Sequence, residues 1–203
     1  MAQSQGGRGG GGKGRAASAP TQAPRGPRSP RGPAPATPER LEAAALAYLE
    51  RFSSSAAHLS RLLLAKVRRS ARTHGTDAQA GARAVEEIVR RLVAAGVVDD
   101  RRYAEGKTAS LRRRGASARF VRGTLAAKGV DSALVDEALQ QAAEGVDEPE
   151  QAAARTFARR RRLGPWRSKD RRLHRSRDLA ALGRAGFSYG VARTVIDGEA
   201  EED

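Results

Sequence analysis

The side chains in this sequence that could do chemistry are mainly arginines. Between Arg155 and Arg177, eleven Lys or Arg residues face a single acid, Asp170. Four of these cations, Arg159 to Arg162, are consecutive, so on a helix they would surround the axis instead of lining one face. The cluster favours contact with phosphates, which makes affinity depend steeply on salt; a solvated basic face is the alternative. The complete set of candidate DNA- or partner-binding residues is Arg112, Arg113, Arg114, Arg119, Arg122, Lys128, Arg159, Arg160, Arg161, Arg162, Lys169, Arg171 and Arg172.

The candidates outside this cluster also have structural interpretations. Arg112 to Arg114 end a predicted helix, where cations suit the negative end of the helix dipole without any ligand. Arg119, Arg122 and Lys128 could line one face of the next helix. The single tryptophan, Trp166, could stack on an unpaired base, but in a chain with so few aromatic residues packing against the protein is favoured.

Residue patterns typical of enzymes and metal sites are missing from the sequence. There is no cysteine, and the three histidines, His58, His74 and His174, have no metal-ligand spacing. Asp99 and Asp100 are adjacent at a predicted helix start and are better explained as caps than as an acid–base pair. The Gly-rich N-terminus lacks the Lys-Ser/Thr that completes a phosphate-binding loop. We therefore expect no catalytic residue, no metal and no cofactor, and a protein that is not an enzyme.

The overall charge favours an anionic partner. The chain of 203 residues has 38 Lys and Arg against 23 Asp and Glu, a formal net charge of +15, and such an excess is typical of proteins that bind nucleic acid. No apolar run approaches the roughly 18 residues that a membrane span needs, and the N-terminus has no signal-peptide pattern. We expect a cytoplasmic monomer that does not contact membranes.

The first 37 residues differ in composition from the rest. Residues 1–37 are rich in Gly and Pro, contain six basic residues and no acid, and offer almost no apolar surface to bury. Such a segment cannot compensate the entropy lost on ordering. The sequence predicts a disordered basic tail, with a short acidic end at the opposite terminus.

From Thr37 onward the apolar residues recur with helical spacing. Thr37 and Pro38 predict a helix start, and no stretch alternates apolar and polar residues as a strand would. The three apolar faces predicted first are Leu41, Ala45, Tyr48, Leu49 and Phe52; Leu59, Leu62, Leu63 and Val67; and Val85, Ile88, Val89, Leu92 and Val93. The fold class predicted is all-α.

Two repeated patterns indicate tandem units. Leu-x-x-x-Gly followed by an apolar residue and a capping Asp or Ser ends at Gly96, Gly129 and Gly186, which predicts tight corners between helices. Ser55-x3-Leu59-x3-Leu63 recurs 62 residues later as Ser117-x3-Val121-x3-Leu125. About nine helices then form three three-helix units, over 38–98, 99–148 and 149–203. Units of this kind stack into an elongated, curved array that offers a binding surface instead of a catalytic pocket.

These motifs resemble the RecX family of regulatory proteins. The likeness covers about residues 40–198, with four pieces in order at the right separations. The matching pieces are Tyr48-Leu49-x-Arg51-Phe52 with Ser55 and Leu59; Leu92-x-x-x-Gly96-Val97-Val98-Asp99-Asp100-x-x-Tyr103-Ala104; Gly115 to Ser117 with Leu125-x-x-Lys128-Gly129-Val130; and Leu182-x-Arg184-x-Gly186-Phe187-Ser188.

The resemblance implies a modulator of the recombinase RecA. Members of the RecX family are held to bind in the groove of the RecA filament on single-stranded DNA. There they limit filament growth and the ATPase, strand-exchange and co-protease activities of RecA. DNA repair, recombination and the SOS response would be regulated in this way. The partners implied are the RecA filament and the single strand inside it, with weak direct binding to DNA as a further expectation.

Two other functions fit parts of the sequence. A direct DNA-binding protein of nucleoid or repressor type would use one Gly-turned corner as a reading motif, although no corner is followed by an obvious set of residues for base edges. An RNA- or ribosome-associated protein would explain the tail and the arginines but not the repeats.

Overall fold

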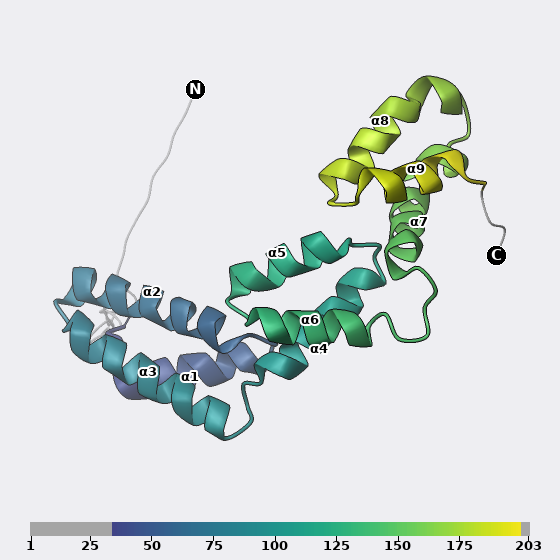
Figure 1. Ribbon diagram of the computed structural model, residues 1–203. Coiled ribbons are helices and arrows are strands. Elements are labelled where there is room, and N and C mark those ends of the chain that lie inside the picture. Colours follow the sequence, from purple (N-terminus) through teal and green to yellow (C-terminus); the bar gives the residue numbers. More distant parts are fainter. Residues whose placement is uncertain (1–33, 200–203) are drawn as a thin grey trace, which may run out of the picture. The chain divides into compact units, whose positions relative to one another are not determined.

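The described part of the chain, residues 34–199, is built from helices alone (Figure 1). In this computed structural model these residues form nine α-helices and one short 3-10 turn, and none of them lies in a strand. The all-α fold class is therefore confirmed. The predicted tail lies mostly outside the described residues, as does the acidic end from residue 200 onward.

The helices follow one another with short connections. Their bounds are α1 Pro38–Leu49, α2 Ala56–His74, α3 Ala78–Ala94, α4 Asp100–Arg112, α5 Ala118–Lys128, α6 Ser132–Gln141, α7 Pro149–Arg161, η1 Gly164–Trp166, α8 Arg171–Arg184 and α9 Tyr189–Asp197.

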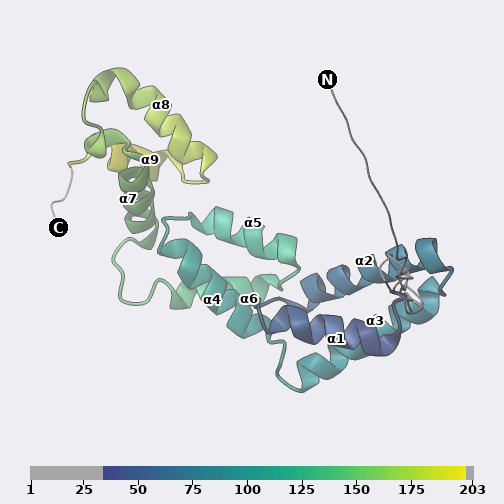
Figure 2. The ribbon, with the colours of Figure 1, turned by 180° about the vertical axis from the view of Figure 1, so that it is seen from behind.

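Figure 1 and Figure 2 show the α-helices arranged in three consecutive sets of three. Each set has its own apolar core. We call α1–α3, α4–α6 and α7–α9 the first, second and third helix groups. The three-helix repeats are confirmed, whereas the predicted domain boundaries stay a prediction. The buried core residues are Leu41, Ala45, Leu59, Leu63, Val67, Val85, Ile88, Leu92 and Val98 in the first group; Ala104, Val121, Leu125, Val130, Val135 and Ala138 in the second; and Ala153, Ala154, Ala158, Leu163, Leu182, Phe187, Ala192, Val195 and Ile196 in the third.

Most predicted helix ends are present, but two predicted core residues are exposed. Gly96, Gly129 and Gly186 all have positive φ, which is the conformation that such tight corners use. Phe52 is 52% exposed because α1 ends at Leu49, so Phe52 follows the helix instead of lying on its buried face. Val93 is 46% exposed. It lies eight residues after Val85, and at 3.6 residues per turn such spacing drifts to the edge of the apolar stripe.

The repeated serines join neighbouring helix groups. Ser55, fully buried at the start of α2, donates from Oγ to the carbonyl of Lys128 at 2.6 Å, and it accepts from the N–H of His58 in its own helix at 3.2 Å. Ser117, at the start of α5, repeats both contacts with the carbonyl of Ala185 at 2.7 Å and the N–H of Phe120 at 3.1 Å. Each serine thus begins a helix in one group and donates to a carbonyl at a helix end of the next group. We call the contacts around Ser55 the first joint and those around Ser117 the second joint.

A carboxylate completes each of these joints from the other side. Asp100, at the start of α4, accepts from the N–H of Ala56 at 2.8 Å. Glu150, at the start of α7, accepts from the N–H of Ala118 at 3.1 Å. The first amides of a helix have no acceptor within that helix, so each group supplies the acceptor that its neighbour lacks. Asp99 caps its own helix as predicted, whereas Asp100 serves α2.

Candidate nucleic-acid interface

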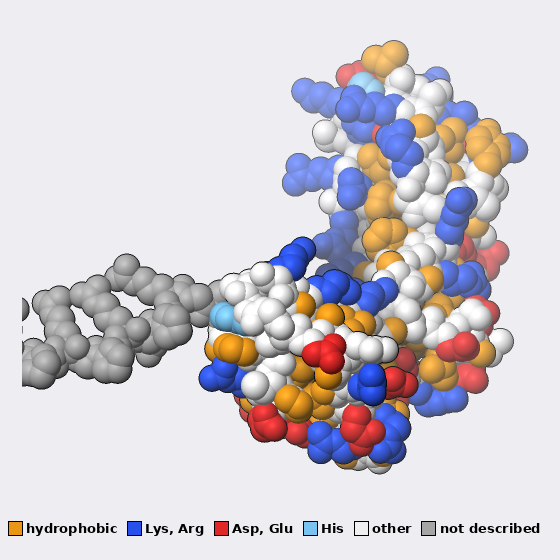
Figure 3. Space-filling model, turned by 90° about the vertical axis from the view of Figure 1, so that its left-hand side faces the viewer, with side chains coloured by type: hydrophobic (Ala, Val, Ile, Leu, Met, Phe, Trp, Pro, Cys, Tyr) orange, Lys and Arg blue, Asp and Glu red, His pale blue; other side chains and the backbone are white. Residues whose placement is uncertain are grey.

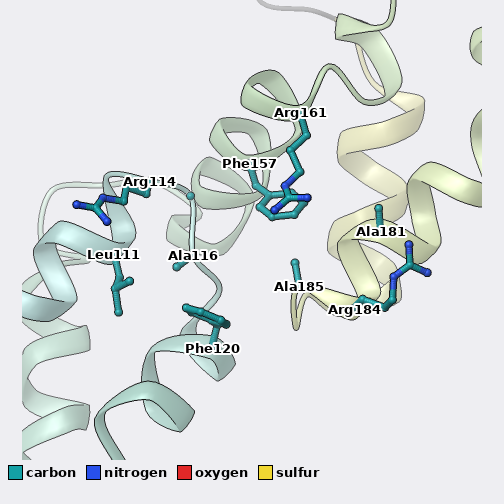
Figure 4. A pocket seen from close by; sticks show the side chains of 10 residues that line it. Leu111, Arg114, Ala116, Phe120, Phe157, Arg161, Ala181, Arg184 and Ala185 are labelled. Atoms are coloured by element: carbon teal, nitrogen blue, oxygen red, sulfur yellow. The ribbon is translucent and has the colours of Figure 1, made fainter. Parts of the chain in front are cut away.

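An apolar hollow edged by arginines lies beside the second joint (Figure 4). It has a volume of about 430 Å³, and a second hollow of about 320 Å³ shares Phe120, Arg184 and Ala185 with it. We call the two together the Arg–Phe groove. No acidic residue lines either hollow. The lining residues are Leu111, Arg114, Gly115, Ala116, Phe120, Phe157, Arg161, Ala181, Arg184 and Ala185 in the first, with Arg119, Gly123, Thr124 and Gly186 added by the second.

The two aromatic rings of the groove differ in how far other protein groups cover them. Phe157, half-buried on α7, packs edge-on against Phe187 with ring centroids 5.9 Å apart, and the guanidinium of Arg161 lies 4.9 Å from its ring centroid. Figure 4 shows this stacking of Arg161 on Phe157. Phe120 is 53% exposed. The ring of Phe157 is thus already covered by protein, whereas much of Phe120 remains available.

A glycine allows the groove to form. Gly115, between α4 and α5, has φ +79°, and a Cβ there would come within 2.5 Å of the backbone nitrogen of Phe157. Only glycine therefore lets this turn approach α7 so closely. Arg112 stabilises this contact between the turn and α7. It forms an ion pair with Glu150 at 2.9 Å and donates to the carbonyls of Ala116 and Pro149.

Several of the predicted interface residues make contacts inside the protein, among them Arg112, Arg122 and Arg171. Arg112 is mostly buried at the joint, and Arg122 pairs with Asp136 at 2.9 Å on the surface. Arg171 donates to the carbonyls of Ile196 and Gly198. These contacts give each of the three a structural role.

Lys128 lies at the first joint. Its ammonium donates to Nε2 of His58 at 3.1 Å. Partial burial lowers the pKa of His58, and the charges of Lys128 and Arg61 lower it further, so the neutral ring is favoured as acceptor. Lys128 thus links the first and second helix groups.

Of the remaining predicted residues, some line the groove and the others lie elsewhere on the exposed surface. Arg114, Arg119 and Arg161 line the groove, although in Figure 4 the guanidinium of Arg114 points away from the two phenylalanine rings. Arg160 reaches the carbonyl of Arg114 at 3.4 Å. Those that are exposed and do not line the groove are Arg113, Arg159, Arg160, Arg162, Lys169 and Arg172.

Basic residues are concentrated in the third helix group. Residues 149–199 contain 13 Lys or Arg against five Asp or Glu, whereas residues 99–148 contain nine of each. On the face drawn in Figure 3, Lys and Arg side chains crowd the upper, more distant part of the molecule, and acidic ones gather mainly on the nearer, lower part. Among the three helix groups, the third therefore carries the largest excess of positive charge that could attract an anionic partner.

Two acids in the third group neutralise part of this charge. Asp178 is buried and accepts from Arg167 at 2.6 Å and from the N–H of Gly164 at 2.9 Å. Burial by itself would raise the pKa of Asp178, but these hydrogen bonds outweigh burial and hold the pKa below its usual range. Asp197 accepts from Arg175 through both oxygens at 2.7 Å, which lowers the pKa of Asp197.

The sequence interpretation missed three groove residues. Phe120 and Phe157 are apolar residues next to the buried stripes of their helices, and Arg184 belongs to the Leu-x-Arg-x-Gly corner. The position of Phe120 between Arg119 and Arg122 was the available signal, because aromatic residues among arginines are typical of single-strand binding. Trp166 packs partly buried against the third core, as favoured from the sequence.

Two further kinds of site are absent from residues 34–199. No three His, Asp or Glu side chains there are arranged to hold a metal ion. None of the helices in that range combines the length and the apolar character that crossing a membrane requires.

Comparison with known proteins identifies the family. The family model described as RecX, second three-helix domain, matches residues 99–139. Regulatory protein RecX of Myxococcus xanthus is 43% identical over 162 residues, which is 79% of this chain and 86% of the relative. This chain belongs to the RecX family. A RecX protein of Streptomyces coelicolor is 31% identical over 121 residues, which is 59% of this chain and 62% of the relative.

Solved RecX structures share the fold. The crystal structure of RecX from Lactobacillus salivarius has a TM-score of 0.56 and 21% identity, over 79% of this chain and 94% of that one. A second structure, of regulatory protein RecX, has a TM-score of 0.54 and 21% identity, over 79% and 74%. At this identity the structures support the three-helix repeats of the RecX fold.

Proposed function

We propose that this RecX protein regulates RecA by binding the RecA filament on single-stranded DNA and mainly inhibiting its recombinase, ATPase and co-protease activities. The observation that carries the proposal is the 43% identity to a regulatory protein RecX over most of both chains. Repair and recombination of DNA would be regulated through this contact. The protein would act as a monomer in the cytoplasm, without catalysis of its own.

The charge distribution supports a nucleoprotein partner. A filament with DNA presents phosphates, and cations of the third helix group are suited to them. The Arg–Phe groove adds apolar surface beside that charge. Direct binding to duplex DNA, the alternative function, gains no specific support, because Asp99, Asp131 and Ser188, which start the helices after the three corners, are engaged in caps.

The test is hydrolysis of ATP by RecA on single-stranded DNA, with this protein added below one molecule per RecA. We expect strong inhibition by the natural chain. The variant Arg161→Glu/Arg184→Glu, which reverses two groove charges, should need at least tenfold more protein. Inhibition only after the protein saturates the DNA would contradict the proposal and favour simple competition for DNA.

A matched variant controls for net charge. Arg68→Glu/Arg69→Glu changes the charge by the same amount on exposed positions of α2 in the first helix group. We expect this variant to inhibit RecA nearly as well as the natural chain. Equal loss in both variants would show that the total charge, and not the groove, determines the inhibition.

A further inference from the structure

Phe120 exposes an aromatic ring at the meeting point of two hollows. It is 53% exposed although its neighbour Val121 is fully buried. Both hollows of the Arg–Phe groove include Phe120, Arg184 and Ala185. Burial of an apolar ring in a hollow by a partner lowers the free energy of binding.

The surroundings of Phe120 restrict the partner to one with negative charge beside flat apolar groups. Arg119, Arg161 and Arg184 line the groove, and no acid does. Arg161 already stacks on Phe157, so Phe120 is the groove's aromatic ring with surface to offer. Single-stranded nucleic acid alternates phosphates with flat bases and therefore matches both features.

We infer that a base of single-stranded DNA stacks on Phe120 while the phosphates beside it contact Arg161, Arg184 and Arg119. A base in a duplex is paired and stacked on its neighbours, and it would have to leave that stack to reach the ring. The groove therefore selects single strands. This inference rests on the proposed function for the choice of DNA as part of the partner, and it assigns the contact to a base and not only to phosphates.

The experiment measures DNA binding with RecA absent. Fluorescence anisotropy follows the full-length chain binding to a labelled single-stranded oligonucleotide and to an oligonucleotide of equal length in which abasic sites replace the bases. The natural chain should bind the abasic strand about tenfold more weakly, because stacking is lost. Phe120→Ala should weaken binding to the normal strand about tenfold and leave binding to the abasic strand unchanged.

A second exposed phenylalanine provides the control. Phe52 is exposed to 52% and lines a different hollow, which includes Asp99 and Glu105. Phe52→Ala should bind both strands as the natural chain does. Phe120→Trp should retain the preference for the normal strand, because the larger ring can still stack. Circular dichroism of each variant checks that the helices are intact.

Two results would overturn the inference. The first is that the natural chain binds the normal and the abasic strand equally and that Phe120→Ala binds both in the same way. The second is a Phe120→Ala variant that binds DNA normally but no longer inhibits RecA, which would assign the groove to a protein segment. If base-dependent binding holds while the natural chain leaves RecA unaffected, the inference is supported and the proposed function fails.

Discussion

Single hydroxyl groups at Ser55 and Ser117 connect the repeated helix groups. Each hydroxyl accepts one hydrogen bond within its helix and donates one to a carbonyl of the next group. A serine has one donor and two acceptor positions, so both contacts form at once. The 62-residue repeat in the sequence therefore reflects the joint as well as the apolar core.

Ser117→Ala should destabilise the protein by about 2–4 kcal/mol, because the partly buried carbonyl of Ala185 loses its donor in addition to the helix losing its cap. Ser188→Ala is the matched control, since Ser188 caps only its own α9 at an exposed position; its cost should be about 1 kcal/mol. Urea unfolding followed by circular dichroism measures both. Equal losses would show that the contact with the next group adds no stability.

At the scale of elements, the third helix group depends on an ion pair where the other two groups use apolar residues. Asp178 on α8 binds Arg167 and the N–H of Gly164, and so fixes the 3-10 turn against the helix. The position matching Leu63 and Leu125 in α8 is Leu182, but His174 and Asp178 replace the serine and the apolar residue before it. The stability of this group should therefore depend on pH.

Because the folded pKa of Asp178 is lowered, its carboxylate contributes stability that is present above the ordinary aspartate pKa of about 4. This stability is lost as the pH falls through the folded pKa. Thermal unfolding between pH 7 and pH 2 should show a decline in that window, and Asp178→Asn should unfold at lower temperature at pH 7 with a shallower decline. An unchanged pH profile in the variant would assign the acid sensitivity to other carboxylates.

Helix positions could be predicted from the sequence, but the contacts between helices could not. Caps such as Asp131 and corner glycines such as Gly129 depend on residues close in the chain, so local patterns suffice. Arg112 looked like a candidate ligand contact, and only the approach of Glu150, 38 residues later, shows its internal role. The exposure of Phe120 could not be predicted from the sequence either, because it depends on where α7 and α8 lie.

At the scale of the whole molecule, charge is distributed unevenly among the helix groups. The second group is balanced, whereas the third carries eight more cations than acids among residues 149–199. Long-range attraction to nucleic acid should therefore orient the third group toward the partner. The total charge of the chain does not describe this orientation.

The salt dependence of single-strand DNA binding should reveal this asymmetry. Arg160→Glu/Arg172→Glu in the third group should reduce the slope of log affinity against log salt by about 1–2, as expected for one or two lost phosphate contacts. Arg68→Glu/Arg69→Glu in the first group, with the same change in charge, should alter the slope by less than half as much. Titrations from low to moderate salt give both slopes. Equal changes of slope in the two variants would contradict the expectation that the third group faces the DNA.

The carboxylates of the joints also make two backbone amides into reporters of docking. Ala56 and Ala118 are first residues of helices, where N–H groups normally face water and exchange hydrogen rapidly. Here Asp100 and Glu150 accept from them, so each amide is protected only while two helix groups are in contact. Hydrogen–deuterium exchange at Ala56 and Ala118 would therefore time the separation of neighbouring groups, independently of the unfolding of any one of them.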